Sequence, residues 1–129
     1  MNKDIITIGD KDTSDIELIW FHGYGANNWS FEPFIKLLNF NLDGRLHVIM
    51  PNASFEGGRR SWYPLPKEID GKVVEDDDGI LNSKKNILSI LSPHISSGKR
   101  LFIGGFSQGA GLALSLGLNG DIECECIVA

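Results

Sequence analysis

The sequence predicts an α/β fold with a mainly parallel sheet and helices on both faces. The first observation is a pair of apolar runs, Ile16–Phe21 and residues 101–103, with almost no polar alternation, as in strands covered on both faces. The second is that segments with helical spacing of apolar residues separate the strand candidates. The 129-residue length suits one domain with a real core, so residues 1–129 are expected to form a single domain.

Three strands are expected in the first half of the chain. Ile5–Ile8 is a weak strand candidate at a sheet edge, and Ile16–Phe21 is the central strand. A third strand, residues 46–50, stops at Pro51. A helix between the second and third strands would make them a right-handed parallel unit.

That helix is expected over residues 31–40, whose apolar side chains recur at helical spacing. Ser30 is the predicted N-cap. Pro33 then falls in the first turn, where its missing N–H costs little.

The longest connection, residues 52–78, has no regular pattern and is the expected lid or binding loop. Its aromatic residues Phe55, Trp62 and Tyr63 could line an apolar substrate groove. Alternatively, Trp62 packs the segment onto the core.

Three acids, Asp76, Asp77 and Asp78, precede the next helix, which is expected to run down between Pro93 and Gly98. Acids at this position cap a helix and interact with its dipole, so metal binding is not needed to explain them.

The stretch over residues 100–118, RLFIGGFSQGAGLALSLGL, predicts a strand, a tight turn at Ser107 and a helix. A serine on such a corner has strained backbone angles, and Gly105 and Gly109 remove side chains that would collide there. The helix directs free N–H groups, including that of Gln108, at the space above Ser107. Ser107 is therefore a candidate nucleophile toward an ester or thioester carbonyl. The alternatives are an ordinary glycine-rich turn or an anion-binding helix start.

The segment His22-Gly23-Tyr24-Gly25 follows the central strand. Its glycines allow a sharp turn over the sheet, so this loop is expected beside the loop that carries Ser107.

The last residues, 124–129, predict another strand after a turn at residues 117–120, and the layer looks cut after it. Cys124 and Cys126 would point to one face of this strand. We interpret them as small buried hydrophobic residues of a reducing compartment, because no other cysteine completes a metal or redox site.

Composition excludes several classes of function. A net charge of −5 argues against nucleic acid or an anionic membrane as the main partner. The N-terminus lacks the pattern of a signal peptide, and no stretch is long enough for a membrane span. A cytoplasmic location is the default expectation.

Several motifs together resemble the carboxylesterase, lysophospholipase and acyl-protein thioesterase group of the α/β-hydrolase superfamily. They are GGFSQG at the turn that carries Ser107, hereafter the elbow, the strand ending in FHGYG, PNA after the third strand, SWY in the long segment and the acidic run EDDDGI. The resemblance covers the chain from about Leu18 to Ala129.

The resemblance implies Ser107 as nucleophile and the backbone N–H groups of Gln108 and Tyr24 as an oxyanion hole. It places Trp62 beside the substrate groove, although Pro64 stands where members commonly have an acid. It also implies small acyl ester or thioester substrates, no cofactor and no metal, and a homodimer in some members.

One departure concerns the catalytic acid and base, which in this family follow the nucleophile in chain order. The sequence ends before either, so the domain is expected to be truncated after the strand that follows the nucleophile helix. His22 is expected to be structural, and neither His47 nor His94 is placed to serve Ser107. The chain alone is therefore expected to be nearly inactive.

Two alternatives to a partial enzyme stay open. One is a naturally short, non-catalytic relative that binds acyl ligands or a partner through the groove around Trp62. The other is a separate chain that supplies the remaining strands and pairs with the edge at residues 124–129.

Overall fold

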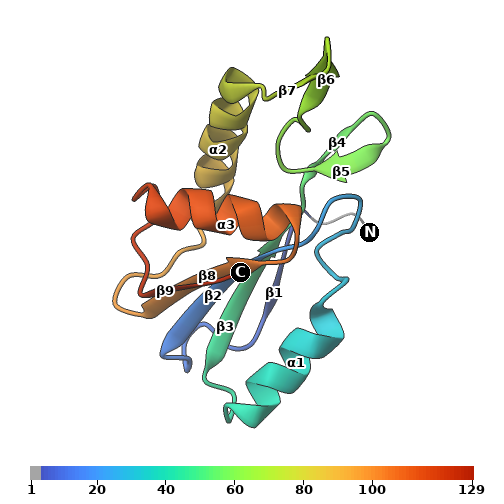
Figure 1. The fold of residues 1–129 in the computed structure, drawn as a ribbon. Helices are drawn as coiled ribbons and strands as arrows, with labels where there is room; N and C mark the ends of the chain where they lie inside the picture. Colours follow the sequence, from blue (N-terminus) through green and yellow to red (C-terminus); the bar gives the residue numbers. More distant parts are fainter. Residues whose placement is uncertain (1–3) are drawn as a thin grey trace.

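A five-stranded sheet lies at the centre of the computed structural model, which describes residues 4–129 (Figure 1). Its strands, in the spatial order β1-β3-β2-β8-β9, are β1 (Ile5–Ile8), β3 (Leu46–Pro51), β2 (Ile16–Phe21), β8 (Arg100–Gly105) and β9 (Cys126–Val128). All are parallel to their neighbours except β1, which pairs antiparallel with β3. The predicted mainly parallel sheet is confirmed, with β1 at one edge and β2 in the middle.

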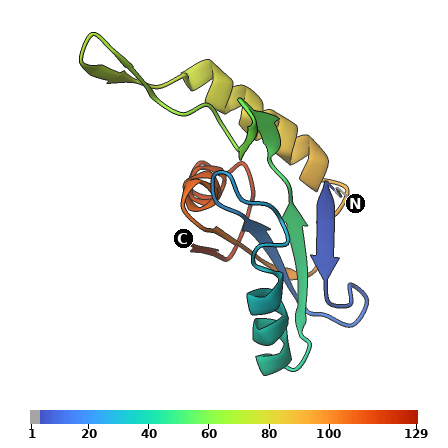
Figure 2. The same ribbon diagram turned by 90° about the vertical axis from the view of Figure 1, so that its right-hand side faces the viewer.

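Helices cover both faces of the sheet, as predicted (Figures 1 and 2). Helix α1 (Glu32–Asn41) covers one face, whereas α2 (Asp77–Leu91) and α3 (Gln108–Leu118) cover the other. Neighbouring residues of a strand point to opposite faces, so Leu18 packs in the cluster with α1 and Ile19 in the cluster with α2 and α3. This double burial explains why β2 is apolar almost throughout.

The start of α1 differs from the prediction. Phe31 occupies the N-cap position and no side chain caps the helix, although Pro33 does lie in the first turn. The Ser30 hydroxyl instead donates to Asn27 Oδ1 over 3.1 Å and accepts from the Asn27 N–H. Ser30 was therefore wrong as the N-cap, because a local turn competes for its hydroxyl.

The segment over residues 52–78 is not irregular as predicted, because it contains two β-hairpins. The first joins β4 (Ser54–Glu56) to β5 (Arg59–Ser61), and the second joins β6 (Lys67–Ile69) to β7 (Lys72–Val74). The turn residues Gly57, Gly58, Asp70 and Gly71 all have positive φ, as two-residue hairpin turns of type I′ require. Their strands are only three residues long, too short for sequence alternation to reveal.

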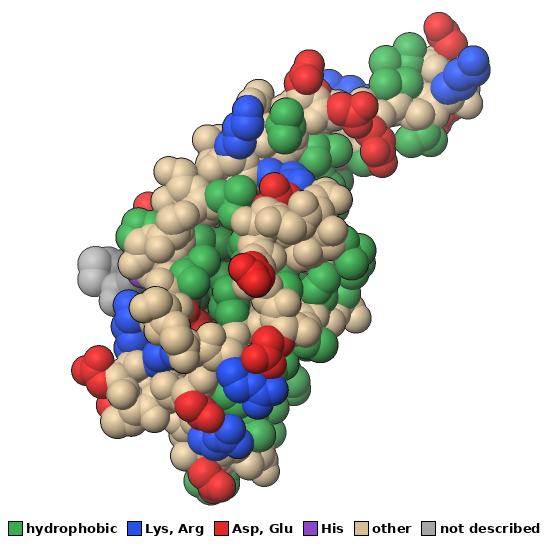
Figure 3. Space-filling model, turned by 90° about the vertical axis from the view of Figure 1, so that its left-hand side faces the viewer, with side chains coloured by type: hydrophobic (Ala, Val, Ile, Leu, Met, Phe, Trp, Pro, Cys, Tyr) green, Lys and Arg blue, Asp and Glu red, His purple; other side chains and the backbone are tan. Residues whose placement is uncertain are grey.

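The second hairpin projects from the body of the molecule (Figure 2). Its side chains Ile69 and Val73 are exposed, and Figure 3 shows hydrophobic, acidic and basic side chains side by side on the projection. The two hairpins thus divide the segment into a part against the core and a part in solvent.

The acids before α2 cap it, as predicted. Asp76 is the N-cap, and its carboxylate accepts from the Gly79 N–H over 2.9 Å. Asp77 and Asp78 lie in the first turn, where negative charge stabilises the positive end of the helix dipole.

The two cysteines differ from each other, which corrects the sequence interpretation. Cys124 is half-buried against the core but precedes β9, whereas Cys126 lies in β9 and is exposed. Burial, together with the neighbouring Cys126, raises the pKa of the Cys124 thiol. Only Cys124 therefore behaves as a small hydrophobic residue.

Candidate active site

Ser107 occupies a sharp corner between β8 and α3. Its backbone angles are φ 56° and ψ −118°, and its side chain is exposed. A positive φ is unfavourable for a residue with a Cβ and occurs where the surrounding structure enforces it. The corner therefore presents the serine hydroxyl to solvent at the carboxyl end of the parallel strands.

Two glycines permit this corner because backbone passes too close for any side chain. A Cβ on Gly105 would lie 2.5 Å from the carbonyl of Gly109, and one on Gly109 would lie 2.2 Å from the Phe21 oxygen. Both distances are far inside van der Waals contact. Gly105 and Gly109 thus allow α3 to start directly against the ends of β2 and β8.

The loop after β2 lies against the same corner, as expected from its glycines. A Cβ on Gly23 would be 3.6 Å from Ser107 Cβ and 3.2 Å from the ring of Phe106. Gly25 has φ 73°, which favours glycine. The loop consequently passes beside the serine.

Two backbone N–H groups near this corner lack acceptors. Within residues 4–129, neither the Tyr24 N–H nor the Gln108 N–H donates a hydrogen bond to another protein group. The Gln108 N–H is at the first residue of α3, where helix geometry leaves N–H groups unpaired and partially positive. Such groups can stabilise a developing oxyanion.

His22 is a structural residue. Its Nε2 accepts from the Ala53 N–H over 3.0 Å, so Nδ1 carries the proton and donates to the Gly23 carbonyl over 2.7 Å. Burial, together with the charge of Arg60, lowers the pKa of His22 despite the bond to Gly23. With both nitrogens engaged, the imidazole stays neutral and has no free position for a proton from Ser107.

The other two histidines do not serve Ser107 either. His47 is buried and pairs with Glu17 near the amino ends of β2 and β3, whereas Ser107 lies at the carboxyl ends of the strands. His94 follows the carboxyl end of α2. In the part of the chain that the structure describes, the Ser107 hydroxyl makes no hydrogen bond, and no cluster of three or more His, Cys, Asp or Glu residues could hold a metal ion.

Trp62 is buried, with 3% of its surface exposed, and packs edge-on against Phe21 over a ring distance of 5.2 Å. This position agrees with the alternative in which Trp62 packs the long segment onto the core. A role beside substrate stays a prediction. Phe55 is exposed beneath the guanidinium of Arg60, and Tyr63 is half-buried beside α3, so the three aromatic residues point in different directions.

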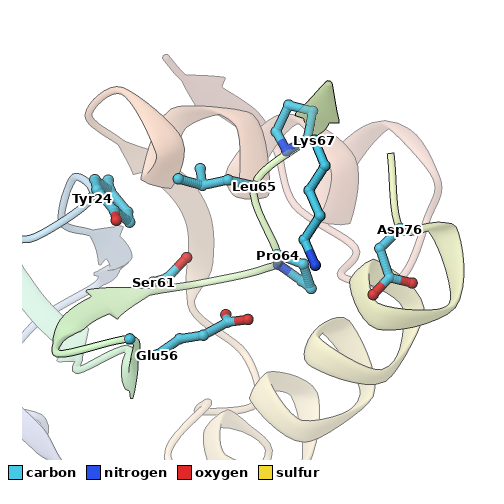
Figure 4. Close-up of a pocket in the computed structure, with 9 residues that line it drawn as sticks. Tyr24, Glu56, Ser61, Pro64, Leu65, Lys67 and Asp76 are labelled. Carbon is cyan, nitrogen blue, oxygen red and sulfur yellow. The ribbon is translucent and has the colours of Figure 1, made fainter. Parts of the chain in front are cut away.

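A cavity of about 260 Å³ opens next to the loop after β2 (Figure 4). Tyr24 and Leu65 form its apolar side, and the carboxylates of Glu56 and Asp76 lie on the other. Ser61 lies between these sides (Figure 4). The cavity thus combines apolar and charged walls within reach of the loop that carries the Tyr24 N–H.

The side chain of Gln108 is the site feature that sequence reasoning missed. It is buried, and all its hydrogen bonds go to residues 61–63 of the long segment. The sequence signal for this role was limited to the presence of a glutamine next to the serine. Its hydrogen-bond partners lie 45 to 47 positions away, and the sequence does not identify them.

No helix within residues 4–129 is long and apolar enough to cross a membrane.

The chain is 30% identical over 113 residues to acyl-protein thioesterase 1 homolog 1 of Dictyostelium discoideum, covering 79% of this chain and 50% of that protein. It is 29% identical over 126 residues to acyl-protein thioesterase 1 of Yarrowia lipolytica, covering 87% and 54%.

Among solved structures, Zea mays acyl-protein thioesterase 2 superposes with a TM-score of 0.67 at 25% identity, over 85% of this chain and 48% of that one. The chain therefore spans about half the length of the relatives it matches. The model of the phospholipase/carboxylesterase family matches residues 2–129. This match extends over nearly every residue, and the chain belongs to the phospholipase/carboxylesterase family of α/β-hydrolases.

Proposed function

We propose that this chain carries the nucleophile and oxyanion hole of a serine hydrolase that cleaves acyl esters or thioesters. The observation behind the proposal is that Ser107 lies on a strained, exposed corner beside two backbone N–H groups, those of Tyr24 and Gln108, that have no acceptor among residues 4–129. Strain of this kind is typical of functional positions.

In the proposed reaction, Ser107 Oγ attacks the acyl carbonyl carbon while a base takes its proton. The N–H groups of Tyr24 and Gln108 stabilise the negative oxygen, and the alcohol or thiol leaves with a proton. Water then attacks the acyl-serine, which releases the acid and restores the hydroxyl. The chemistry requires no metal or cofactor.

The base is the group that the described residues do not provide. Each of the three histidines is engaged or distant, and a serine without a base is a weak nucleophile. We therefore expect residues 1–129 alone to turn over substrate very slowly, with the remaining triad members supplied from outside this stretch. Cytoplasmic location and a homodimer remain proposals.

Covalent labelling tests the proposal without requiring turnover. The chain is incubated with an alkyl fluorophosphonate, with and without imidazole as an external base, and the modified residue is located by mass spectrometry. Labelling of Ser107 that imidazole accelerates and Ser107→Ala abolishes is the expected result. Ser115 lies on the same helix and serves as the matched control, since Ser115→Ala should be labelled like the wild type.

Absence of labelling at Ser107 above the level of other serines would contradict the proposal. It would favour the alternative of a non-catalytic relative, because a binding protein has no need of a reactive serine. Calorimetry with a fatty-acid amide, which resists cleavage, would then measure acyl-ligand binding directly.

A further inference from the structure

The geometry points to a positioning role for the Gln108 side chain: it fixes residues 60–63, the bridging segment, and thereby sets the separation of the Tyr24 and Gln108 N–H groups. This inference rests on the proposed function, which assigns both N–H groups to one oxyanion. It concerns the side chain of Gln108, whereas the oxyanion hole uses only its backbone.

The Gln108 amide bonds to three consecutive residues of the bridging segment. Its Oε1 accepts from the Trp62 N–H over 2.9 Å, and its Nε2 donates to Ser61 Oγ over 2.9 Å and to the Tyr63 carbonyl over 3.0 Å. Both donor hydrogens and one acceptor position are thus used, all on three consecutive residues. The first turn of α3 is therefore tied firmly to the bridging segment.

The Ser61 hydroxyl makes this arrangement specific to an amide. It donates its own hydrogen to the Tyr63 carbonyl over 2.7 Å, so its oxygen must accept from Gln108. A carboxylate at position 108 would face two acceptors, Ser61 Oγ and the Tyr63 oxygen, with no hydrogen to donate. Only a side chain with both an acceptor and two donors satisfies the three partners.

The bridging segment also holds the loop after β2. The Trp62 indole Nε1–H donates to the His22 carbonyl over 2.6 Å, and the Arg60 carbonyl accepts from the Gly25 N–H over 2.8 Å. These two bonds bracket Tyr24 from both sides along the chain. The indole is buried, so its bond is shielded from competition by water.

The bridging segment is thus bonded to the elbow on one side and to the Tyr24 loop on the other. Two N–H groups from separate loops stabilise an oxyanion only when both point at the same position within hydrogen-bond distance. The two loops also approach each other directly: the Phe106 N–H donates to the Phe21 carbonyl over 3.1 Å, and a Cβ on Gly23 would lie 3.2 Å from the ring of Phe106. That hydrogen bond joins the elbow to the end of β2, three residues before Tyr24, and does not reach the Tyr24 peptide. The hydrogen-bonded bridge supplies the orientation of that peptide.

Hydrogen exchange measured by NMR on the full chain tests the role independently of catalysis. The variant Gln108→Met keeps the side-chain length and removes the hydrogen bonds. Exchange of the Gly25 N–H and the Trp62 indole N–H, which donate to Arg60 and His22 and not to Gln108, should accelerate about tenfold. The amide of Ile49, in the middle of β3, should stay within about twofold and reports on global unfolding.

Two controls make the outcome decisive. Leu114→Met changes an exposed residue of the same helix and should leave all three rates unchanged. If Gln108→Met also accelerates Ile49, the milder Ser61→Ala removes one acceptor and should accelerate only Gly25 and the indole. Acceleration confined to the Trp62 main-chain N–H, with Gly25 and the indole unchanged, overturns the inference, because Gln108 would then be only a local contact.

The labelling experiment separates this inference from the proposed function. If both hold, Gln108→Met slows fluorophosphonate labelling of Ser107 about tenfold while the fold is retained. Accelerated exchange in a protein whose Ser107 is never labelled leaves the bridge standing and rejects the proposed function. Normal labelling of Ser107 in Gln108→Met, with exchange unchanged, rejects the bridge and leaves the function standing.

Discussion

The carboxylate of Glu17 in β2 accepts a hydrogen bond from Nδ1 of His47 in β3 over 2.9 Å, and both side chains are buried. The Ser96 N–H and hydroxyl also donate to this carboxylate, over 2.6 and 2.9 Å. Although burial raises the pKa of Glu17, the bonds from Ser96 and His47 outweigh it and hold the pKa below its ordinary value. The cluster lies at the opposite end of the strands from Ser107 and joins β2, β3 and the segment after α2.

A depressed carboxyl pKa stabilises the fold above the unfolded-state value of 4.5, and this contribution is lost as pH falls through the folded-state pKa. Glu17→Gln should therefore lower the free energy of unfolding by about 2 kcal/mol at neutral pH. The difference from wild type should shrink as urea unfolding is repeated down to about pH 3. Exposed Glu123→Gln is the control, and a difference independent of pH would contradict the assignment.

Gly109→Ala should destabilise the fold by about 3 kcal/mol, because the new Cβ would lie 2.2 Å from the Phe21 oxygen. The sign is diagnostic, since alanine in a helix is favoured over glycine by about 1 kcal/mol. Gly117→Ala, in the same helix, meets the flexible end of Ile127 and should cost less. Chemical denaturation compares the two, and equal losses would count against the backbone clash.

Replacement of Ser107 by glycine should relieve backbone strain. At φ 56°, Ser107→Gly should be about 1 kcal/mol more stable than Ser107→Ala, which keeps the strain. Thermal unfolding of the pair measures the difference. A glycine variant no more stable than the alanine variant would show that the corner is unstrained.

Loss of the α2 cap should be measurable as a loss of stability. Asp76→Ala removes the acceptor of the Gly79 N–H and should cost about 1 kcal/mol. Asp77→Ala removes only a charge near the helix start and should cost about 0.5 kcal/mol or less. Denaturant titration measures the free energy of unfolding of both variants. A larger loss for Asp77→Ala than for Asp76→Ala would contradict the assignment of Asp76 as the N-cap.

The elbow and the positions of the main strands along the chain were predictable because their signals are local. Residues 100–118 contain the apolar run, the two glycines and the small-residue helix in one stretch, which is the local pattern of a strand, a sharp turn and a helix around Ser107. The capping role of Asp76 was predictable for the same reason. In contrast, Ser30 was wrongly predicted as the N-cap because its hydroxyl bonds to Asn27 in a local turn. The two hairpins were missed because strands of three residues are too short to show alternation in the sequence.

The α/β class, the position of Ser107 and the pattern of glycines around it can be read from the sequence, since periodicity and the spacing of the glycines are local features. That His22 is engaged at both nitrogens, that Trp62 is buried and that Gln108 bonds to residues 61–63 became apparent only in the folded chain. Apart from the bond of His22 Nδ1 to the neighbouring Gly23, the hydrogen bonds among these residues join positions 31 to 47 apart. Such contacts exist only after the chain has folded, because the energy of a hydrogen bond depends on geometry and burial that no local pattern specifies.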